Sequence, residues 1–112
     1  MRVHIDSRIR IRSEALVFLL NNLGHESSHS DPAEMLESDV IIIDLDERSP
    51  LYPSPTSKPT LALSCAGFNR DTLSALGYCG VIEPETSTTD LAIMLESACH
   101  GLPWVNGIAL QV

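Results

Sequence analysis

Two aspartates stand at positions where this chain could do chemistry. Asp6 follows the apolar run that ends at Ile5, and Asp44 follows the run Val40–Ile43, so each comes directly after a predicted strand. If these strands are neighbours in a parallel sheet, both carboxylates lie at one edge, with Asp46 near them. Such a cluster can bind Mg²⁺, and one of its carboxylates can accept a phosphoryl group.

A hydroxyl could complete such a site. Ser64 ends the next predicted strand along the chain and could donate a hydrogen bond to an anion placed on Asp44. Acidic residues that end strands are, however, also ordinary solvated loop residues. The residue types and their spacing leave both interpretations open.

These residues need an α/β scaffold to bring them together, and the rest of the sequence predicts one. Val40–Ile43 is apolar without interruption, which is typical of a central parallel strand covered on both faces. Strands alternate with helices, so the crossovers give a parallel sheet with helices on both faces. Strands are expected over residues 2–5, 40–43, 60–64 and 79–82, a weak edge strand over 25–30, and helices over 13–23, 31–37, 69–76 and from 87 onward.

Capping residues and helix breakers set the ends of these elements. The predicted N-caps are Ser13, Asp31, Asn69 and Ser87. Gly24 and Gly77 are expected to end the helices that precede them. Four prolines between residues 49 and 59 exclude a helix in that segment.

The composition excludes several classes of protein. The chain has 112 residues, which indicates one domain. With 15 Asp+Glu against 7 Lys+Arg, its formal net charge of −8 argues against gripping nucleic acid or an anionic membrane surface. No apolar stretch is long enough to span a membrane and no signal peptide is evident, so a cytoplasmic location is expected.

Cysteine and histidine add no candidate metal site. Cys65, Cys79 and Cys99 lack CxxC spacing and are expected to be small buried hydrophobic residues in a reducing compartment. His25 and His29 stand among polar residues, which favours a polar loop or edge strand over a metal-binding pair.

Two segments resemble response-regulator receiver domains. Asp39–Leu45 is similar to the receiver strand that closes on the phosphorylated aspartate and is followed by leucine. Residues 77–101 are similar without gaps to the last strand and helix of receivers from LuxR-type transcription regulators, and Trp104 fits their pattern. The resemblance covers about residues 2–104. It implies a receiver-like domain over 1–104, and a tail or the start of an interdomain linker over 105–112.

The implied fold is flavodoxin-like (CheY-like), a doubly wound α/β fold with a five-stranded parallel sheet. The segment between Asp44 and Ser64 is too short for the usual third helix, which is expected to be missing or replaced by a proline-rich loop. The resemblance assigns Asp44 as the equivalent of the phosphoacceptor. It assigns Asp6 as the first of two acidic metal-binding residues and Ser64 as the residue that senses the phosphoryl group.

Three positions depart from the family pattern. Ser7 stands where the second acidic metal-binding residue is expected, and Pro84 stands where receivers carry a lysine. The aromatic switch position falls on Val81. No Lys or Arg lies between Asp71 and Val112, so no small shift in register restores the lysine.

These departures predict a degenerate receiver, or pseudo-receiver, that keeps the fold and the interaction surface without conventional phosphorylation control. It would not be an enzyme and would act in signal transduction as part of a transcription regulator. One alternative is a conventional receiver, phosphorylated on Asp44 by a histidine kinase within a two-component phosphorelay. A further alternative is another flavodoxin-like protein or an enzyme.

The same interpretation gives expectations for ligands and partners. No cofactor is expected, and Mg²⁺ should bind Asp6 and Asp44 weakly or not at all. A homodimer is expected, with the last helix and the tail that follows it, Leu102, Trp104 and Val105, in the interface. A histidine kinase or another signalling protein is the expected partner. DNA would be contacted only through a C-terminal domain. Because no lysine balances Asp6 and Asp44, the substitution Asp44→Asn is expected to raise stability by about 0.5–1 kcal/mol and to leave regulatory output intact.

Overall fold

The computed structural model describes residues 1–29, 32–47, 53–54, 57–64 and 70–100, and the backbone of residues 104–105 and 108–109. Its helices are α1 (Arg10–Asn22), α2 (Pro32–Glu37), α3 (Arg70–Ala75) and α4 (Thr88–Cys99), with a 3₁₀ turn, η1, at Leu45–Glu47. Its strands are β1 (Arg2–Asp6), β2 (Glu26–His29), β3 (Val40–Asp44), β4 (Thr60–Leu63), β5 (Gly80–Ile82), β6 (Trp104–Val105) and β7 (Ile108–Ala109).

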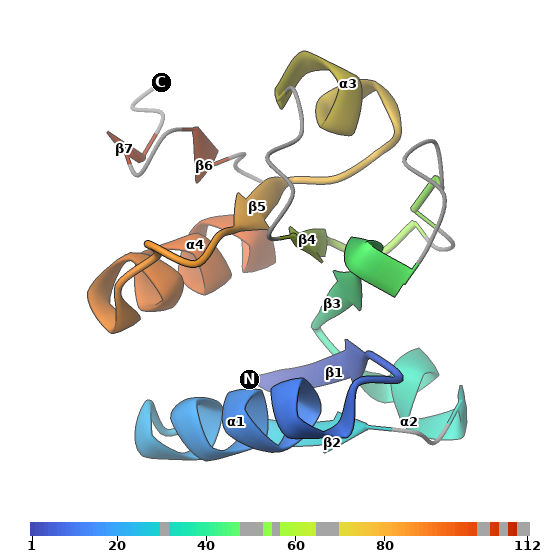
Figure 1. Ribbon diagram of the computed structural model, residues 1–112, viewed down its shortest axis with the longest axis vertical. Helices are drawn as coiled ribbons and strands as arrows, with labels where there is room; N and C mark the ends of the chain where they lie inside the picture. The colour runs from blue at the N-terminus through green and yellow to red at the C-terminus, as the bar shows by residue number, and fades with distance from the viewer. Residues whose placement is uncertain are drawn as a thin grey trace.

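Five of the described strands form one parallel sheet, in the order β2-β1-β3-β4-β5. Figure 1 shows α1 and α4 on one side of this sheet and α2 and α3 on the other. This is the strand order of the flavodoxin-like fold. The predicted doubly wound fold is therefore confirmed. β6 and β7 pair antiparallel in a separate two-stranded sheet, and the expected domain boundary after residue 104 stays a prediction.

Each face of the sheet has its own aliphatic core. On one face, α1 and α4 pack against the sheet through Leu16, Leu20, Leu91, Met94, Leu95 and Ala98. On the other face, α2 and α3 cover Ile41, Ile43 and Ala62 with Met35 and Leu73. All residues of β3 are buried, because this strand lies at the centre of the sheet and is covered on both sides. The uninterrupted apolar run of β3 thus has the environment that the sequence predicts for it.

The strand register brings the candidate residues to one edge of the sheet. Asp6 lies opposite Ile43, and Asp44 lies opposite Leu63 in the neighbouring strand. Ser64 follows directly after Leu63, and its N–H donates to the carbonyl of Ile82 at 3.0 Å. β1, β3 and β4 therefore end side by side at their carboxyl ends, where ligands bind in folds of this type.

The first helix begins three residues earlier than the sequence predicts. Ile9, whose side chain makes no capping hydrogen bond, is the N-cap of α1. Ser13 was the expected N-cap, but it is buried within the helix, and its Oγ donates to the carbonyl of Arg10 at 3.0 Å. The predicted cap is wrong because a serine inside a helix can bond a carbonyl of the preceding turn. The additional residues include Arg12, which matters for the site.

Other local predictions are confirmed. Ser87 caps α4, and its Oγ accepts a hydrogen bond from the N–H of Asp90 at 3.1 Å. Between β3 and β4 the described residues hold only the 3₁₀ turn η1 and no α-helix. The caps expected at Asp31 and Asn69 lie outside the described residues, as does Leu102 of the expected dimer contact. No helix among the described residues is long and apolar enough to cross a membrane.

The cysteines and histidines lie in different environments. Cys79 is half-buried and Cys99 is exposed, and both are free thiols. The prediction of buried cysteines is therefore wrong for Cys99, which lies in the last turn of α4, while Cys65 lies outside the described residues. The prediction of an edge strand near His29 is confirmed, because β2 is the outermost strand on its side of the sheet.

Gly77 is expected to resist substitution more strongly than Gly24. Both glycines follow helices with positive φ, +97° at Gly77 and +85° at Gly24, so alanine is strained at either position. A Cβ at Gly77 would also lie 3.2 Å from the Cβ of Ser54, whereas a Cβ at Gly24 would meet nothing within 4 Å. We expect Gly77→Ala to lower the free energy of unfolding by about 2 kcal/mol and Gly24→Ala by about 1 kcal/mol. Urea denaturation of both variants tests this order, and equal losses would contradict it.

Candidate functional site

Asp44 is buried at the end of β3 and bonded on both carboxylate oxygens. None of its side chain reaches solvent. Oδ1 accepts from Nη1 of Arg12 at 3.0 Å and from the N–H of Asp46 at 3.0 Å. Oδ2 accepts from Oγ of Ser7 at 2.8 Å and from Nη1 of Arg12 at 3.1 Å. The carboxylate thus accepts four hydrogen bonds from the protein. A buried charge requires such partners in place of water.

Arg12 supplies the positive charge of this site. Its Nη1 also donates to Oδ2 of Asp46 at 2.7 Å, so one guanidinium group bridges two carboxylates. The side chain of Arg12 is 29% exposed and that of Asp46 is 16% exposed, so the cluster is largely screened from water. In such surroundings charges interact more strongly than at an exposed surface. Arg12 reaches Asp44 because it shares a helix stripe with the buried residues Leu16 and Leu20 at spacings of four residues.

The expectation of an unbalanced pair of carboxylates is therefore wrong. It rested on the missing lysine after β5, and no Lys or Arg stands in the last forty or so residues of the sequence. The cation comes instead from the opposite end of the chain, thirty-two residues before Asp44. The physical reason is that α1 begins early enough to place Arg12 over the end of β3.

Ser7 and Asp6 lie at the end of β1 and have different surroundings. Ser7 follows the strand, and its Oγ also accepts from the N–H of Ile9 at 3.2 Å, which fixes the turn into α1. Ser7 therefore bonds Asp44 where a second carboxylate would have repelled it. Asp6 is half-buried and lines a hollow on the side of β1 that faces β2.

The residues of this site do not fit a divalent metal ion. Mg²⁺ requires several oxygen ligands in an octahedral arrangement. No group of three or more acidic, histidine or cysteine residues in the described part of the chain is placed to hold a metal. The oxygens of Asp44 and Asp46 that could bind one instead accept hydrogen bonds from Arg12. The guanidinium group thus takes the role of counter-charge.

Ser64 and Arg12 donate to different carboxylate oxygens of Asp46. Its side chain is fully buried, and its Oγ donates to Oδ1 of Asp46 at 3.3 Å. The structure therefore brings Ser64 into the cluster through Asp46. A chain of contacts runs from Ser64 through Asp46 and Arg12 to Asp44 and then Ser7.

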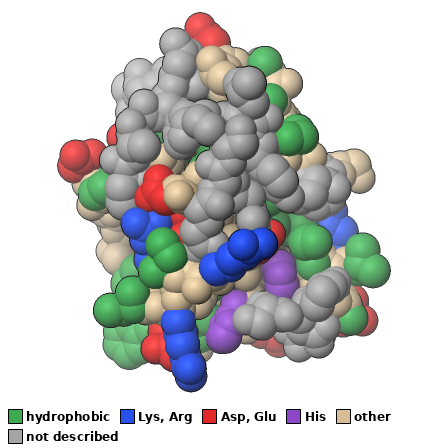
Figure 2. Space-filling model, turned by 45° about the vertical axis from the view of Figure 1, so that its right-hand side comes forward, with side chains coloured by type: hydrophobic (Ala, Val, Ile, Leu, Met, Phe, Trp, Pro, Cys, Tyr) green, Lys and Arg blue, Asp and Glu red, His purple; other side chains and the backbone are tan. Residues whose placement is uncertain are grey.

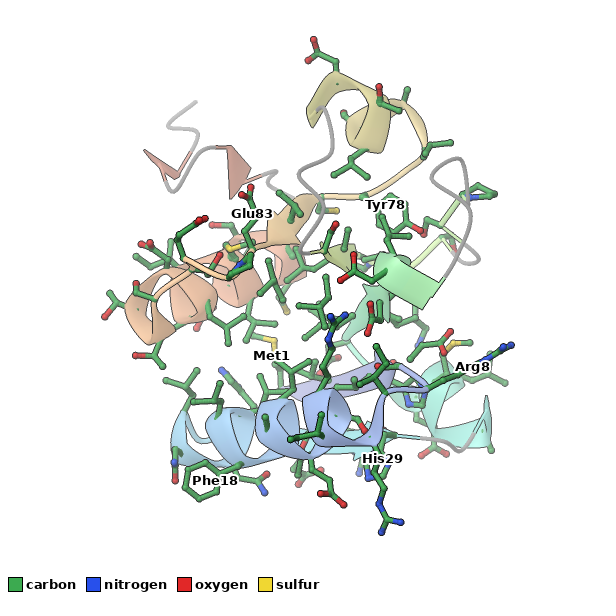
Figure 3. The ribbon with its side chains drawn as sticks, in the orientation of Figure 1. Met1, Arg8, Phe18, His29, Tyr78 and Glu83 are labelled. Atoms are coloured by element: carbon green, nitrogen blue, oxygen red, sulfur yellow. The ribbon has the colours of Figure 1, made fainter. Side chains whose placement is uncertain are left out.

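The remaining candidate positions follow β5. Val81 is half-buried within β5 and packs against the core on the face of α2 and α3. Pro84 is exposed in the turn after the strand. Glu83 is exposed beyond the end of β5, where its N–H donates to Oγ1 of Thr86 at 2.9 Å (Figure 3). None of these side chains supplies a positive charge to Asp44.

Solved structures with the same fold include response-regulator proteins and their receiver domains. The ShkA Rec1 domain, solved in complex with c-di-GMP, has a TM-score of 0.72 at 21% identity over 85% of this chain and 89% of that one. A putative response regulator from Chloroflexus aurantiacus has a TM-score of 0.68 at 15% identity over 88% and 97% of the two chains. The receiver domain of a Francisella response regulator gives 0.65 at 14% identity over 89% and 97%.

The chain has the receiver fold. This agrees with the resemblance carried by Asp39–Leu45 and residues 77–101. No model of a known protein family matches the sequence, and no curated protein matches it. At 12–21% identity the solved structures establish the fold alone.

Proposed function

We propose that this chain is a signal-transduction regulatory domain, a degenerate receiver that acts through protein–protein contacts without phosphorylation at Asp44. It carries no enzymatic activity of its own and works in the cytoplasm as part of a LuxR-type transcription regulator. Its upstream partner is a histidine kinase or another signalling protein, and contact with DNA belongs to a separate domain. The receiver fold supports a signalling role, and the environment of Asp44 supports the degenerate state.

The observation that carries this proposal is the ion pair between Arg12 and Asp44. Phosphoryl transfer to a carboxylate needs an accessible oxygen in line with the phosphorus and a cation that neutralises the transferred group. Both oxygens of Asp44 are instead buried and each accepts two hydrogen bonds. Phosphorylation would require Arg12 and Ser7 to move and a metal ion to enter.

A phosphorylation assay tests the proposal. The chain is incubated with acetyl phosphate and Mg²⁺ and its intact mass is measured. We expect no phosphoryl adduct, because no oxygen of Asp44 faces solvent. In a parallel Mg²⁺ titration followed by amide chemical shifts near Asp6 and Asp44, we expect no saturation below about millimolar concentration.

A working receiver domain treated in the same way is the positive control for the reagent. A phosphoryl group found on Asp44 of this chain would overturn the degenerate assignment and support the conventional receiver. Saturation by micromolar Mg²⁺ would likewise show that Arg12 yields its place to a metal ion.

An apolar stripe on α1 supports self-association. Ile11 is 75% exposed and Phe18 is 67% exposed, with the exposed Ala15 between them at helical spacing. Figure 3 shows Phe18 on the side of α1 that points away from the sheet. On α4 the one large exposed apolar side chain among the described residues is Ile93, at 38%. We therefore propose the dimer contact on α1, in place of the last helix and its tail that the sequence predicts.

Sedimentation tests the dimer contact. We expect the native chain to sediment as a dimer and the Ile11→Ser, Phe18→Ser double variant to sediment as a monomer. The matched control is Leu36→Ser on α2, which removes an equally exposed apolar side chain and should leave the dimer intact. A monomeric native chain at high concentration would exclude this contact, as would a dimer that survives the double variant.

A further inference from the structure

A hollow lies beside the cluster of Asp44 and Arg12, on the side of β1 that faces β2. Its volume is about 500 Å³, and it is lined by the end of β1, the start of α1, the end of β2 and Met35 of α2. Neither Asp44 nor Arg12 lines it. The hollow is therefore separate from the cluster described above, and the two share only the turn at Asp6 and Ser7.

The described residues that line the hollow include more arginines than carboxylates, although the chain as a whole is acidic. Among the described residues, Arg8 and Arg10 line it together with the imidazoles of His4 and His29 and the carboxylate of Asp6. The chain as a whole has a net charge of −8, and three of its seven basic residues fall between positions 8 and 12. Figure 2 shows two His side chains close to a Lys or Arg side chain in the lower half of the face in view. Arg8 and Arg10 thus give this part of an acidic chain a local excess of positive charge.

The arginines are placed to receive an anion. Both are exposed, and Figure 3 shows Arg8 and His29 at the end of the sheet where α1 begins. Nε of Arg10 pairs with Glu14 at 2.9 Å, but both side chains are more than half exposed. Exposed pairs of this kind contribute little, so Arg10 can exchange its partner for a stronger anion at small cost.

The N-terminus of α1 adds to the positive potential at the hollow. No side chain caps its N-terminus and no acidic residue stands in its first turn. A helix N-terminus carries partial positive charge that favours anions. The histidines supply further hydrogen-bonding nitrogens: His4 is buried with Nδ1 3.0 Å from Oγ of Ser28, and His29 ends β2 at the mouth of the hollow.

We propose that this hollow binds a phosphate-bearing small molecule of about nucleotide size. Planar guanidinium groups match phosphate oxygens in two-pronged hydrogen bonds, which favours phosphate among the anions. A volume of about 500 Å³ exceeds what a lone phosphate fills and falls within the range of small-molecule sites. Ile5 and Met35 provide apolar wall for the rest of the ligand. This inference does not depend on the state of Asp44.

Calorimetric titration of the whole chain with 5′-AMP and with pyrophosphate tests the proposal at fixed ionic strength. We expect saturable binding of both with Kd of about 1 mM or lower. Arg8→Gln and Arg10→Gln should each weaken binding about tenfold. Arg2→Gln is the matched control, because it removes the same charge from an exposed arginine outside the hollow and should change Kd less than twofold. Asp6→Asn should tighten binding severalfold, because it removes the opposing charge.

Neutral adenosine separates recognition of phosphate from recognition of the base. We expect adenosine to bind at least tenfold more weakly than 5′-AMP. Equal binding of adenosine would overturn the assignment of phosphate. Absence of saturation by both phosphate ligands, or equal weakening by Arg2→Gln and by the variants at Arg8 and Arg10, would overturn the site itself.

Discussion

Replacing Arg12 by methionine is expected to lower the free energy of unfolding by about 3 kcal/mol. The substitution keeps most of the volume of the side chain but leaves the fully buried carboxylate of Asp44 without its cation. Removing one partner of a buried ion pair costs several kcal/mol, because the remaining charge stays desolvated. Asp44 keeps hydrogen bonds from Ser7 and from the N–H of Asp46, which places the expected loss at the lower end of that range. Urea denaturation of the native chain and the variant, fitted with a shared m-value, measures this loss of stability.

Arg10→Met is the matched control for Arg12→Met. It removes the same charge two residues earlier in α1, but Arg10 is 87% exposed and pairs only with the exposed Glu14. We expect this control to change stability by less than about 0.5 kcal/mol. If both variants lost the same stability, net charge or helix propensity would explain the effect, and the bridge from Arg12 to Asp44 would not stabilise the fold.

The sheet could be predicted from the sequence because its signals are local. The uninterrupted apolar run of β3 indicates a strand covered on both faces, and the structure buries all of it. The start of α2 at Pro32 and the cap of α4 at Ser87 follow from residues with strong positional preferences. The prolines between residues 49 and 59 likewise exclude a helix between β3 and β4. The described residues of that segment contain no α-helix.

The site could be predicted only in part, because its decisive contact is not local. The ends of β1 and β3 placed Asp6 and Asp44 at one edge of the sheet, but the cation that pairs with Asp44 comes from α1. Taking Ser13 as the N-cap put Arg12 outside the helix and hid its alignment with the buried Leu16 and Leu20. An arginine on the apolar stripe of a helix was the available signal, since such a charge must find a buried partner.

The substitution Asp44→Asn is expected to lower the free energy of unfolding by about 2 kcal/mol, the opposite sign to the expectation from the sequence. The amide keeps the shape of the carboxylate but loses its charge. Its NH₂ group replaces one of the two oxygens that accept from Arg12 and Ser7. Arg12 keeps Asp46 as a partner at 2.7 Å, so the loss is smaller than for Arg12→Met.

A double-mutant cycle separates the pair from its surroundings. If Arg12 and Asp44 interact as the structure shows, the double variant will lose less stability than the sum of the two single variants, by about 1–2 kcal/mol. Additive losses would contradict a direct interaction.

The same Asp44→Asn variant tests function when reporter output of a parent regulator is measured at a temperature where the protein remains folded. Unchanged output supports the degenerate receiver, because asparagine cannot form an acyl phosphate, whereas abolished output in a folded variant would make Asp44 a working phosphoacceptor.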